Sequence, residues 1–422
     1  MNTATSNPEP NFAAFIGLDW ADEKHAYALC LPEGSKPESG ELTHTPQSLQ
    51  EWARKLKERF NGQPVAIALE LARGPLVWAL AEHSFITLYP VTPHASAELR
   101  KALHPSGAKS DPADSLVLLK MLRHHRDRLR PLRLADTSTR LLDQLCRDRR
   151  DAVEERTKHA LRLTAALKEY FPLALEILGP LKNDAACQFL LKWGSLPELQ
   201  AAPLHRVRKF FHGLNCRVQI EERLEQITPA QPLTQDNAVI EAGRRKVQML
   251  ANLIISLNEH IAQYEERIEQ IFKEHPDREL FSGLPGAGAA LAPRLLAAFG
   301  LDRSRYQSAE ELSCYAGIAP IQRSSGKTKS HHMRLACPKY LRQTFHEFAG
   351  KALAYCPWSG KYYEAQRAKG KSHNQAVRSL AFKWMRILWA CWTRNTPYDQ
   401  TTYLKALQKS GSPYAVALPV AA

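Results

Sequence analysis

The stretch Phe15-Ile16-Gly17-Leu18-Asp19 decides the fold of the N-terminal part of this chain. An apolar run that ends in a carboxylate is typical of a buried strand with an acidic residue at its end. A second run of this kind, Val65-Ala66-Ile67-Ala68-Leu69, ends at Glu70. The two runs therefore predict two buried strands, each with a carboxylate at or near its last residue.

Two more carboxylates, Asp111 and Asp114, open a predicted helix in the sequence Asp111-Pro112-Ala113-Asp114. Residues three apart lie on one helix face, so one helix start can present both side chains to the strand ends. The order of strand with Asp, hairpin-like segment, strand with Glu, further strand and acidic helix start is that of a ribonuclease-H-like sheet. This order predicts that all four carboxylates converge.

Converging carboxylates repel one another unless cations neutralise them, and hard oxygen ligands suit Mg²⁺ or Mn²⁺. Two such ions can clamp a phosphodiester during cleavage. A purely structural interpretation is also open. Asp111 is a good N-cap before Pro112, and Asp19 and Glu70 taken singly fit a turn cap and a solvated strand end.

The charge of the chain favours a polyanionic partner. Its 422 residues include 57 Lys and Arg against 43 Asp and Glu, which leaves a formal charge of +14. Between residues 323 and 394 there are 15 basic residues and only two acidic ones, so the excess lies in the C-terminal third. Neither a membrane span nor a secretory pattern is present, and the eight cysteines lack zinc-ligand spacing, so we expect a cytosolic protein.

The pattern divides the chain into an α/β domain, a helical middle and a mainly α-helical C-terminal domain. The predicted strands are 14–19, 26–31, 65–70 and 85–91, and the predicted helices of the first domain are 46–60 and 112–125. The expected boundaries are a disordered tail at 1–13, the α/β domain at 14–135, a helical linker at 136–276, the C-terminal domain at 277–395 and a second tail at 396–422.

The clearest periodic signal lies at about 240–275, where apolar residues alternate spacings of three and four. These residues are Val247, Leu250, Ile254, Leu257, Ile261, Tyr264, Ile268 and Ile271. One interpretation is a coiled coil that sets the oligomeric state or spaces two domains. The other is a single long helix packed on its own protein.

Two segments of the C-terminal third are candidates for contact with phosphate. Leu284-Pro285-Gly286-Ala287-Gly288 has the form of a helix-hairpin-helix turn, in which Gly286 and Gly288 let backbone approach a phosphate. A structural turn between helices looks much the same. Farther on, a predicted loop carries Ser325 among basic residues that can bind phosphate. These basic residues are Arg323, Lys327, Lys329 and Arg334.

The chain resembles the DEDD transposases of bacterial insertion sequences, which are related to Piv-type DNA invertases and described as bridge-RNA-guided recombinases. Five pieces in the correct order carry the resemblance. They are Ile16-Gly17-Leu18-Asp19, Leu69-Glu70, Lys109-Ser110-Asp111-Pro112-Ala113-Asp114, Leu284-Pro285-Gly286-Ala287-Gly288, and Tyr315-Ala316-Gly317-Ile318-Ala319-Pro320 leading to Ser325-Gly326. No counterpart is found for 172–235 or for the segment after Thr396.

The resemblance implies a RuvC-like domain whose tetrad of Asp19, Glu70, Asp111 and Asp114 binds two Mg²⁺ or Mn²⁺ ions. It also implies a C-terminal domain that supplies Ser325 as nucleophile, with the adjacent Ser324 as an alternative by one residue. The implied partners are donor and target DNA, a noncoding guide RNA and further copies of the chain in a dimer or tetramer, acting in the bacterial cytoplasm at the nucleoid.

Two other functional classes remain open from the sequence. A hydrolytic nuclease of the Holliday-junction-resolvase type would use the same tetrad with water as the nucleophile. A noncatalytic nucleic-acid-binding protein would use the four carboxylates only as helix caps and strand ends.

Overall fold

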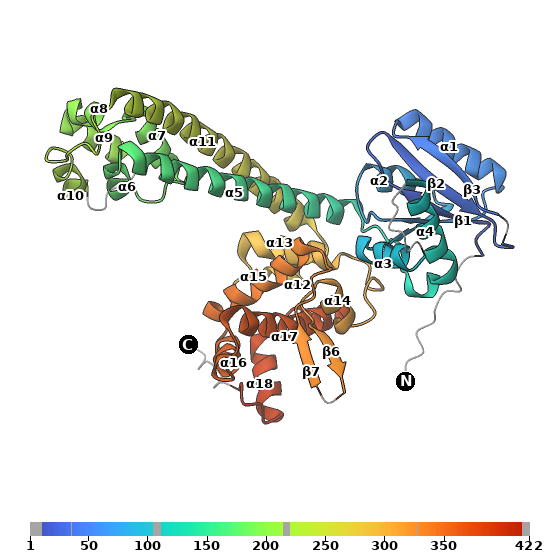
Figure 1. Ribbon diagram of the computed structural model, residues 1–422. Coiled ribbons are helices and arrows are strands. Elements are labelled where there is room, and N and C mark those ends of the chain that lie inside the picture. Colours follow the sequence, from blue (N-terminus) through green and yellow to red (C-terminus); the bar gives the residue numbers. More distant parts are fainter. Residues whose placement is uncertain (1–10, 35, 104–110, 214–219, 327, 416–422) are drawn as a thin grey trace. The chain divides into compact units, whose positions relative to one another are not determined.

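The computed structural model describes all residues except 1–10, 35, 104–110, 214–219, 327 and 416–422, and it describes Asp111 by its backbone alone. Contacts within the chain define two compact units, Met1–Leu134 and Ala135–Ala422. The ribbon of each unit is drawn in Figure 1. The expected tail at 1–13 lies largely outside the described residues.

A five-stranded mixed sheet forms the centre of the first unit. Its strands are β1 (Ala14–Asp19), β2 (Lys24–Cys30), β3 (Glu38–Thr43), β4 (Val65–Leu69) and β5 (Ile86–Pro90). The order across the sheet is β3-β2-β1-β4-β5, and β2 runs antiparallel to both of its neighbours while β1, β4 and β5 are parallel. All four predicted strands are confirmed. The edge strand β3 was not predicted, because only Leu42 among its residues is buried.

Four helices and one short 3-10 turn complete this unit. They are α1 (Pro46–Arg59), α2 (Pro75–Ala81), α3 (Pro93–Leu103), α4 (Asp111–His124) and η1 (Arg126–Arg128). Helix α1 begins as its sequence predicts, with Thr45 accepting a hydrogen bond from the Ser48 backbone and Pro46 in the first turn. Helices α2 and α3 were not predicted, and α3 proves important for the acidic residues.

Helix α4 packs directly on strand β1 at Gly17. A Cβ atom built on Gly17 would lie 2.0 Å from the Ser115 carbonyl oxygen and 2.4 Å from the Leu119 backbone nitrogen. Only glycine permits this approach, because the obstructing atoms belong to the helix backbone and cannot rotate away. Gly17 therefore fixes where α4 crosses the sheet, and with it the position of the helix start.

We expect Gly17→Ala to loosen α4 from the sheet, at a cost of about 3 kcal/mol for overpacking against a rigid backbone. Hydrogen–deuterium exchange of peptides from β1 and α4 measures this directly, and faster exchange in both is the expected result. Gly283→Ala is the matched control, since a Cβ there meets no atom within 4 Å and φ is −86°. Equal protection of β1 and α4 in wild type and Gly17→Ala would contradict the packing described here.

Two long helices, α5 (Thr137–Tyr170) and α11 (Asn237–Glu274), run side by side in the second unit (Figure 1). Arg149 lies 2.5 Å from Glu265 in an ion pair, and Arg156 donates to Asn258 at 2.8 Å. The residue numbers of the contacts rise along α5 while they fall along α11, so the two helices are antiparallel. Between them the chain forms short helices over 173–225, with a hydrophobic core shared with both long helices. These are α6 (Leu173–Ile177), α7 (Asp184–Lys192), α8 (Leu196–Ala201), α9 (Leu204–Gly213) and α10 (Ile220–Glu225).

The periodic apolar positions of α11 are used within the chain. Six of the eight are buried, and Leu257 and Tyr264 are partly exposed. They contribute to the two cores that α11 shares with α5, through residues such as Leu163 and Leu142. The packing of α11 against α5 within one chain thus explains the periodic apolar positions. A role of α11 in self-association stays a prediction.

The rest of the second unit is mainly helical, as expected. Its elements are α12 (Arg278–Ser282), α13 (Gly288–Phe299), α14 (Ala309–Tyr315), β6 (Ile321–Ser325), β7 (Thr328–His332), α15 (Lys339–Tyr355), α16 (Pro357–Ala368), α17 (His373–Arg394) and α18 (Gln400–Lys409). The core contains the fully buried Trp358, Trp384 and Trp392. One expectation was wrong, because the segment around Ser325 is a β-hairpin and not a loop. The segment after 396, which had no assignment from the sequence, includes helix α18.

No helix in the described part of the chain is both long enough and apolar enough to cross a membrane.

Candidate functional site

Asp19 and Glu70 lie at the same edge of the sheet, the one formed by the carboxyl ends of its parallel strands. Strands β1 and β4 are parallel, with Gly17 opposite Ala68. Asp19 and Glu70 each follow that pair by two residues, so the register brings them to corresponding positions at the carboxyl ends of adjacent strands, which lie about 4.8 Å apart in a sheet. The two carboxylates that the sequence predicts in one site thus lie on neighbouring strands at the same level, and their sharing of a site stays a prediction.

The start of helix α4 lies at this same edge. Side chains two residues apart on a strand share a face, so Asp19 is on the face of Gly17, which α4 covers. Ser115 is the residue of α4 that approaches Gly17 most closely, and Asp114 immediately precedes it. Asp114 is buried, at 4% exposure, near the edge that carries Asp19 and Glu70.

Arg100 of helix α3 neutralises Asp114. The Arg100 Nε and Asp114 Oδ1 atoms lie 2.5 Å apart in an ion pair. Both atoms are buried, and neither takes part in a well-aligned hydrogen bond within the described chain. A buried carboxylate needs such a cation, because an unpaired charge in the interior is costly. Arg100 is therefore part of the acidic site, although sequence reasoning missed it.

Ser96, also on α3, holds Glu70. Its hydroxyl donates a short hydrogen bond to Glu70 Oε1, and the Ser96 side chain is almost fully buried. Ser96 and Arg100 are four residues apart and so share one face of the helix. The available sequence signal was Thr92-Pro93, a cap residue followed by proline, which is typical of a helix start.

The buried His25 and the half-buried His44 form an imidazole pair that supports the turn after Asp19. The Ala21 backbone N–H donates to His25 Nδ1 at 3.2 Å, which leaves Nε2 of His25 to donate to His44 Nδ1 at 3.0 Å. Trp20 stacks on His25 with ring centroids 5.0 Å apart. Burial, followed by the proximity of His44, lowers the pKa of His25, so the neutral form that this chain of hydrogen bonds needs is favoured.

The described carboxylates suit a hard divalent cation, because Asp19, Glu70 and Asp114 offer only oxygen donors. The buried Asp114 Oδ1 accepts no well-aligned hydrogen bond in the described chain, although it is ion-paired with Arg100. Among the side chains that the structure describes, no three or more potential ligands are grouped closely enough to hold a metal ion. The fourth member of the predicted tetrad, Asp111, begins α4 with a side chain outside the described residues.

Arg100 and a metal ion would compete for Asp114, which gives a prediction. In Arg100→Met we expect a lower melting temperature in chelator, since breaking a buried pair costs about 3 kcal/mol. We also expect Mn²⁺ to raise the melting temperature more than in wild type. Lys101→Met on the same helix is the control, because the ion pair that Lys101 forms in the described structure is with the exposed Glu98. An equal Mn²⁺ effect in wild type and Arg100→Met would show that the ion does not use Asp114.

Ser325 lies at the tip of the β6–β7 hairpin. The two strands pair from Ile321 with His332 to Ser325 with Thr328, and Gly326 takes the left-handed φ of +55° that a two-residue turn requires. Residues 322–326 are all exposed. The serine is therefore exposed at the tip of a hairpin and is not enclosed in a pocket.

Ser324 and Ser325 point to opposite faces of this hairpin, because side chains alternate along a strand. Ser324 is opposite Lys329. Ser325 shares its face with Arg323 and with Ser330, which is the cross-strand partner of Arg323. Lys327 lies outside the described residues. The two serines are thus not interchangeable, and the one-residue ambiguity becomes a difference that an experiment can detect.

The base of the hairpin is closed by a contact between Gly317 and Cys337. A Cβ atom on Gly317 would lie 2.2 Å from Cys337 Sγ, and φ at this glycine is +69°. Arg334 belongs to this base: its guanidinium donates to Cys314 Sγ at 3.7 Å, and its carbonyl accepts from Arg342 at 3.1 Å. Arg334 is therefore partly engaged in holding the hairpin, whereas Arg323 and Lys329 are exposed.

Packing of the turn against helix α15 explains why residue 286 is a glycine. A Cβ atom on Gly286 would lie 2.9 Å from the Tyr355 ring and 3.0 Å from the Lys351 carbonyl, so this glycine is needed for packing against α15. Gly288 begins α13 and faces open space, with φ +54°. Of the two glycines, Gly288 has room for an approaching phosphate.

Comparison with known proteins identifies the class. A family model described as "Transposase" matches residues 16–172, which include the acidic residues. A second model, described as "Transposase IS116/IS110/IS902 family", matches residues 278–364, which include the Gly286 turn and the hairpin. Together the two models match more than half of the chain. The chain belongs to the IS116/IS110/IS902 family of transposases.

Individual relatives agree with this assignment. The protein assigned as transposase of the IS117 mini-circle of Streptomyces coelicolor is 29% identical over 93% of this chain and 97% of its own length. An uncharacterised protein of insertion element IS110, from the same organism, is 26% identical over 91% of this chain and 95% of its own length. The pilin gene-inverting protein of Moraxella bovis is 29% identical over 34% of this chain and 46% of its own length.

Proposed function

We propose that this transposase cuts and rejoins DNA strands to mobilise an insertion sequence, using a two-metal acidic site and a serine nucleophile. The observation that carries the proposal is the placement of Asp19, Glu70 and Asp114 around one edge and one face of the sheet. A strand-transfer assay on a plasmid that carries the element ends, with Mg²⁺ and with chelator, tests it. Product that forms equally in both would refute the metal-dependent site.

The sheet supports a RuvC-like, ribonuclease-H-like assignment of the first unit. Its order is β3-β2-β1-β4-β5, with β2 as the one strand that runs against the others. Carboxylates at the ends of the two central parallel strands and at the start of the covering helix are what the predicted tetrad requires. Domain boundaries at 14–135, 136–276 and 277–395 remain part of this proposal, as does a helix-hairpin-helix role for residues 284–288.

In the proposed reaction the Ser325 hydroxyl attacks a DNA phosphorus. The bond between Ser325 Oγ and phosphorus forms, the bond from phosphorus to the 3′ oxygen breaks, and the serine proton ends on the released 3′-hydroxyl. Asp19, Glu70, Asp111 and Asp114 would hold two Mg²⁺ or Mn²⁺ ions, which when bound offset charge on the phosphate and activate the hydroxyl. Rejoining to another strand reverses the step without a high-energy cofactor.

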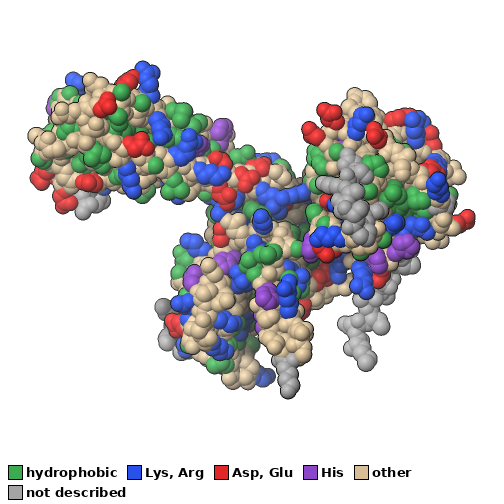
Figure 2. All heavy atoms as spheres, viewed as in Figure 1, with side chains coloured by type: hydrophobic (Ala, Val, Ile, Leu, Met, Phe, Trp, Pro, Cys, Tyr) green, Lys and Arg blue, Asp and Glu red, His purple; other side chains and the backbone are tan. Residues whose placement is uncertain are grey.

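The proposed partners are donor and target DNA, a noncoding guide RNA and further copies of the chain. The formal charge of +14 supports polyanionic partners. Lys and Arg side chains appear over both units on the face seen in Figure 2. The periodic apolar residues of α11 pack against α5, and a role of α11 in forming a dimer or tetramer remains part of the proposal. The proposed location is the bacterial cytoplasm.

We expect the exposed cations of the hairpin to bind phosphate. Arg323→Gln with Lys329→Gln should weaken DNA binding on all sequences and lower the log–log salt slope by roughly 1.8, about 0.9 for each lost duplex contact. Fluorescence anisotropy at several salt concentrations measures the slope.

A control variant with the same loss of charge is Arg162→Gln with Lys168→Gln, at exposed positions of α5. We expect it to keep the wild-type slope. An unchanged slope in the hairpin variant would place the DNA elsewhere.

A further inference from the structure

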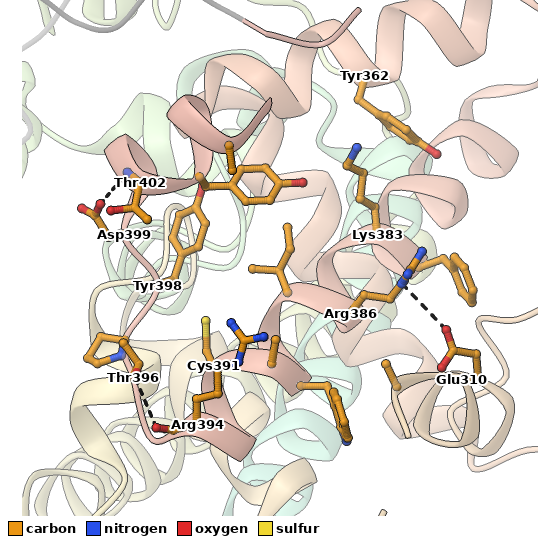
Figure 3. A pocket seen from close by; sticks show the side chains of 18 residues that line it. Glu310, Tyr362, Lys383, Arg386, Cys391, Arg394, Thr396, Tyr398, Asp399 and Thr402 are labelled. Carbon is orange, nitrogen blue, oxygen red and sulfur yellow. Dashed lines mark hydrogen bonds and ion pairs between the residues drawn. The ribbon is translucent and has the colours of Figure 1, made fainter. Parts of the chain in front are cut away.

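A groove beside helix α17 combines positive charge with aromatic rings. It has a volume of about 1030 Å³ and lies between α17, α18 and the start of α14. Figure 3 shows its lining side chains, with Lys383, Arg386 and Arg394 from α17 and Tyr398 from the segment that leads into α18. None of these residues belongs to the acidic site or to the serine hairpin.

The groove has more positive charge than its own acidic residues balance. Glu310 is 3.8 Å from Arg386, a distant pair between exposed side chains that is worth little. Asp399 is occupied as the N-cap of α18, where it accepts from the Thr402 backbone at 2.6 Å. Neither Lys383 nor Arg394 forms an ion pair with an acid in the described part of the chain. An anion in the groove would therefore gain two cations that no described carboxylate uses.

Lys383 is held among aromatic rings. Its Nζ lies 5.1 Å from the Tyr362 ring centroid, 4.8 Å from that of Tyr414 and 5.7 Å from that of Trp358. Burial, and then the neighbouring Arg386, lowers the pKa of Lys383. A nearby anion would offset both effects, because it would favour the charged ammonium.

Tyr398 and Tyr403 form a fixed aromatic wall of the groove. Trp358 donates to the Tyr398 hydroxyl at 2.9 Å, and Tyr398 and Tyr403 lie with ring centroids 6.0 Å apart. Both tyrosines are partly exposed and line the groove, so parts of their rings are open to a ligand. Rings held in place in this way are suited to stacking, since little side-chain freedom is lost on binding.

We infer that this groove binds a nucleotide segment of single-stranded nucleic acid. The phosphate lies at Lys383, Arg386 and Arg394, and a base packs on Tyr398 and Tyr403. A single strand is required, because the faces of bases are covered in a duplex. The volume lies at the upper end of the range for small-ligand pockets, about 300–1000 Å³, and so has room for a nucleotide. The inference rests on the proposed function and extends it.

The test uses a double variant that combines Arg386→Gln with Arg394→Gln. It is compared with the chain that keeps both arginines; both proteins are full length, carry Ser325→Ala and are measured in chelator. Labelled single-stranded RNA, single-stranded DNA and a DNA duplex of one sequence serve as probes. We expect the salt slope for a single strand to fall by about 1.4, roughly 0.7 for each lost contact, with the duplex slope unchanged. Comparison of the RNA and DNA arms identifies which strand the groove takes.

Arg206→Gln with Lys209→Gln, at exposed positions of α9, removes the same charge and should leave all slopes unchanged. An equal loss in this control, an unchanged single-strand slope in the groove variant, or a loss confined to the duplex would each overturn the inference. Because binding is measured without catalysis, a failure of strand transfer would contradict the proposed function and leave this result intact.

Cross-linking gives a second readout. With a 5-bromouracil-substituted strand, we expect ultraviolet cross-links to map to peptides containing Tyr398, Tyr403 or Trp389, three of the aromatic residues that line the groove. These cross-links should disappear in the Arg386→Gln, Arg394→Gln variant. Cross-links confined to other peptides would show that the groove serves a different ligand, such as a peptide segment.

Discussion

Asp19→Asn is expected to lower the rate of DNA strand cleavage roughly 1,000-fold, the equivalent of about 4 kcal/mol of transition-state stabilisation. The reason is that Asp19 ends the central strand β1, beside Glu70 and below the start of α4. Loss of one carboxylate charge weakens the hold on a divalent cation, while the amide keeps the size of the side chain. The measurement is single-turnover cleavage of a labelled DNA that carries the element end.

Asp22→Asn provides the matched control. Asp22 is three residues from Asp19 and is exposed, so its replacement should leave the rate within a few-fold of wild type. Asp114→Asn should match the effect of Asp19→Asn, and circular dichroism should confirm that it folds, because the change leaves Arg100 without its ion-pair partner. Full activity of Asp19→Asn would support a noncatalytic nucleic-acid-binding protein.

Ser325→Ala is expected to abolish strand transfer, with a rate loss of at least about 1,000-fold, since the nucleophile itself is removed. Ser324→Ala should retain activity within a few-fold. The two residues are neighbours of one type, yet their side chains lie on opposite faces of the β6–β7 hairpin. Each substitution therefore serves as the control for the other, and both remove the same hydroxyl group from an exposed strand.

The opposite pattern is equally informative. If Ser324→Ala is inactive and Ser325→Ala is active, the nucleophile lies on the Lys329 face of the hairpin and the family alignment is off by one residue. If both variants cleave DNA and leave 5′-phosphate ends produced by water, the protein is a hydrolytic nuclease and the serines only contact phosphate.

The elements with a strong local pattern were predictable from the sequence. The runs that end at Asp19 and Glu70 are continuously apolar because both faces of those strands are covered, and the start of α4 near Asp111 has a cap residue followed by proline. The relation between Asp19 and Glu70 also follows from sequence, once both strands are taken as parallel neighbours.

The remaining features depend on tertiary contacts that leave little local signal. Helix α3 carries Ser96 and Arg100 on one face, but their role appears only when Glu70 and Asp114 are brought to them. The β6–β7 hairpin was taken for a loop because both of its faces are polar and exposed, so no alternation of apolar residues marks it. The apolar repeat of α11 predicted a long helix correctly and could not say that its partner is α5.

The most direct test of the central claim is the chemical identity of the reaction intermediate. In a stalled reaction with Mg²⁺, denaturing gels should show DNA bound covalently to the protein, and mass spectrometry of the digested adduct should place a 5′-phosphodiester link on Ser325. The adduct should be absent in Ser325→Ala, in Asp19→Asn and in excess chelator. Cleaved DNA in the absence of any protein adduct, together with activity of Ser325→Ala, would contradict a serine-dependent transposase.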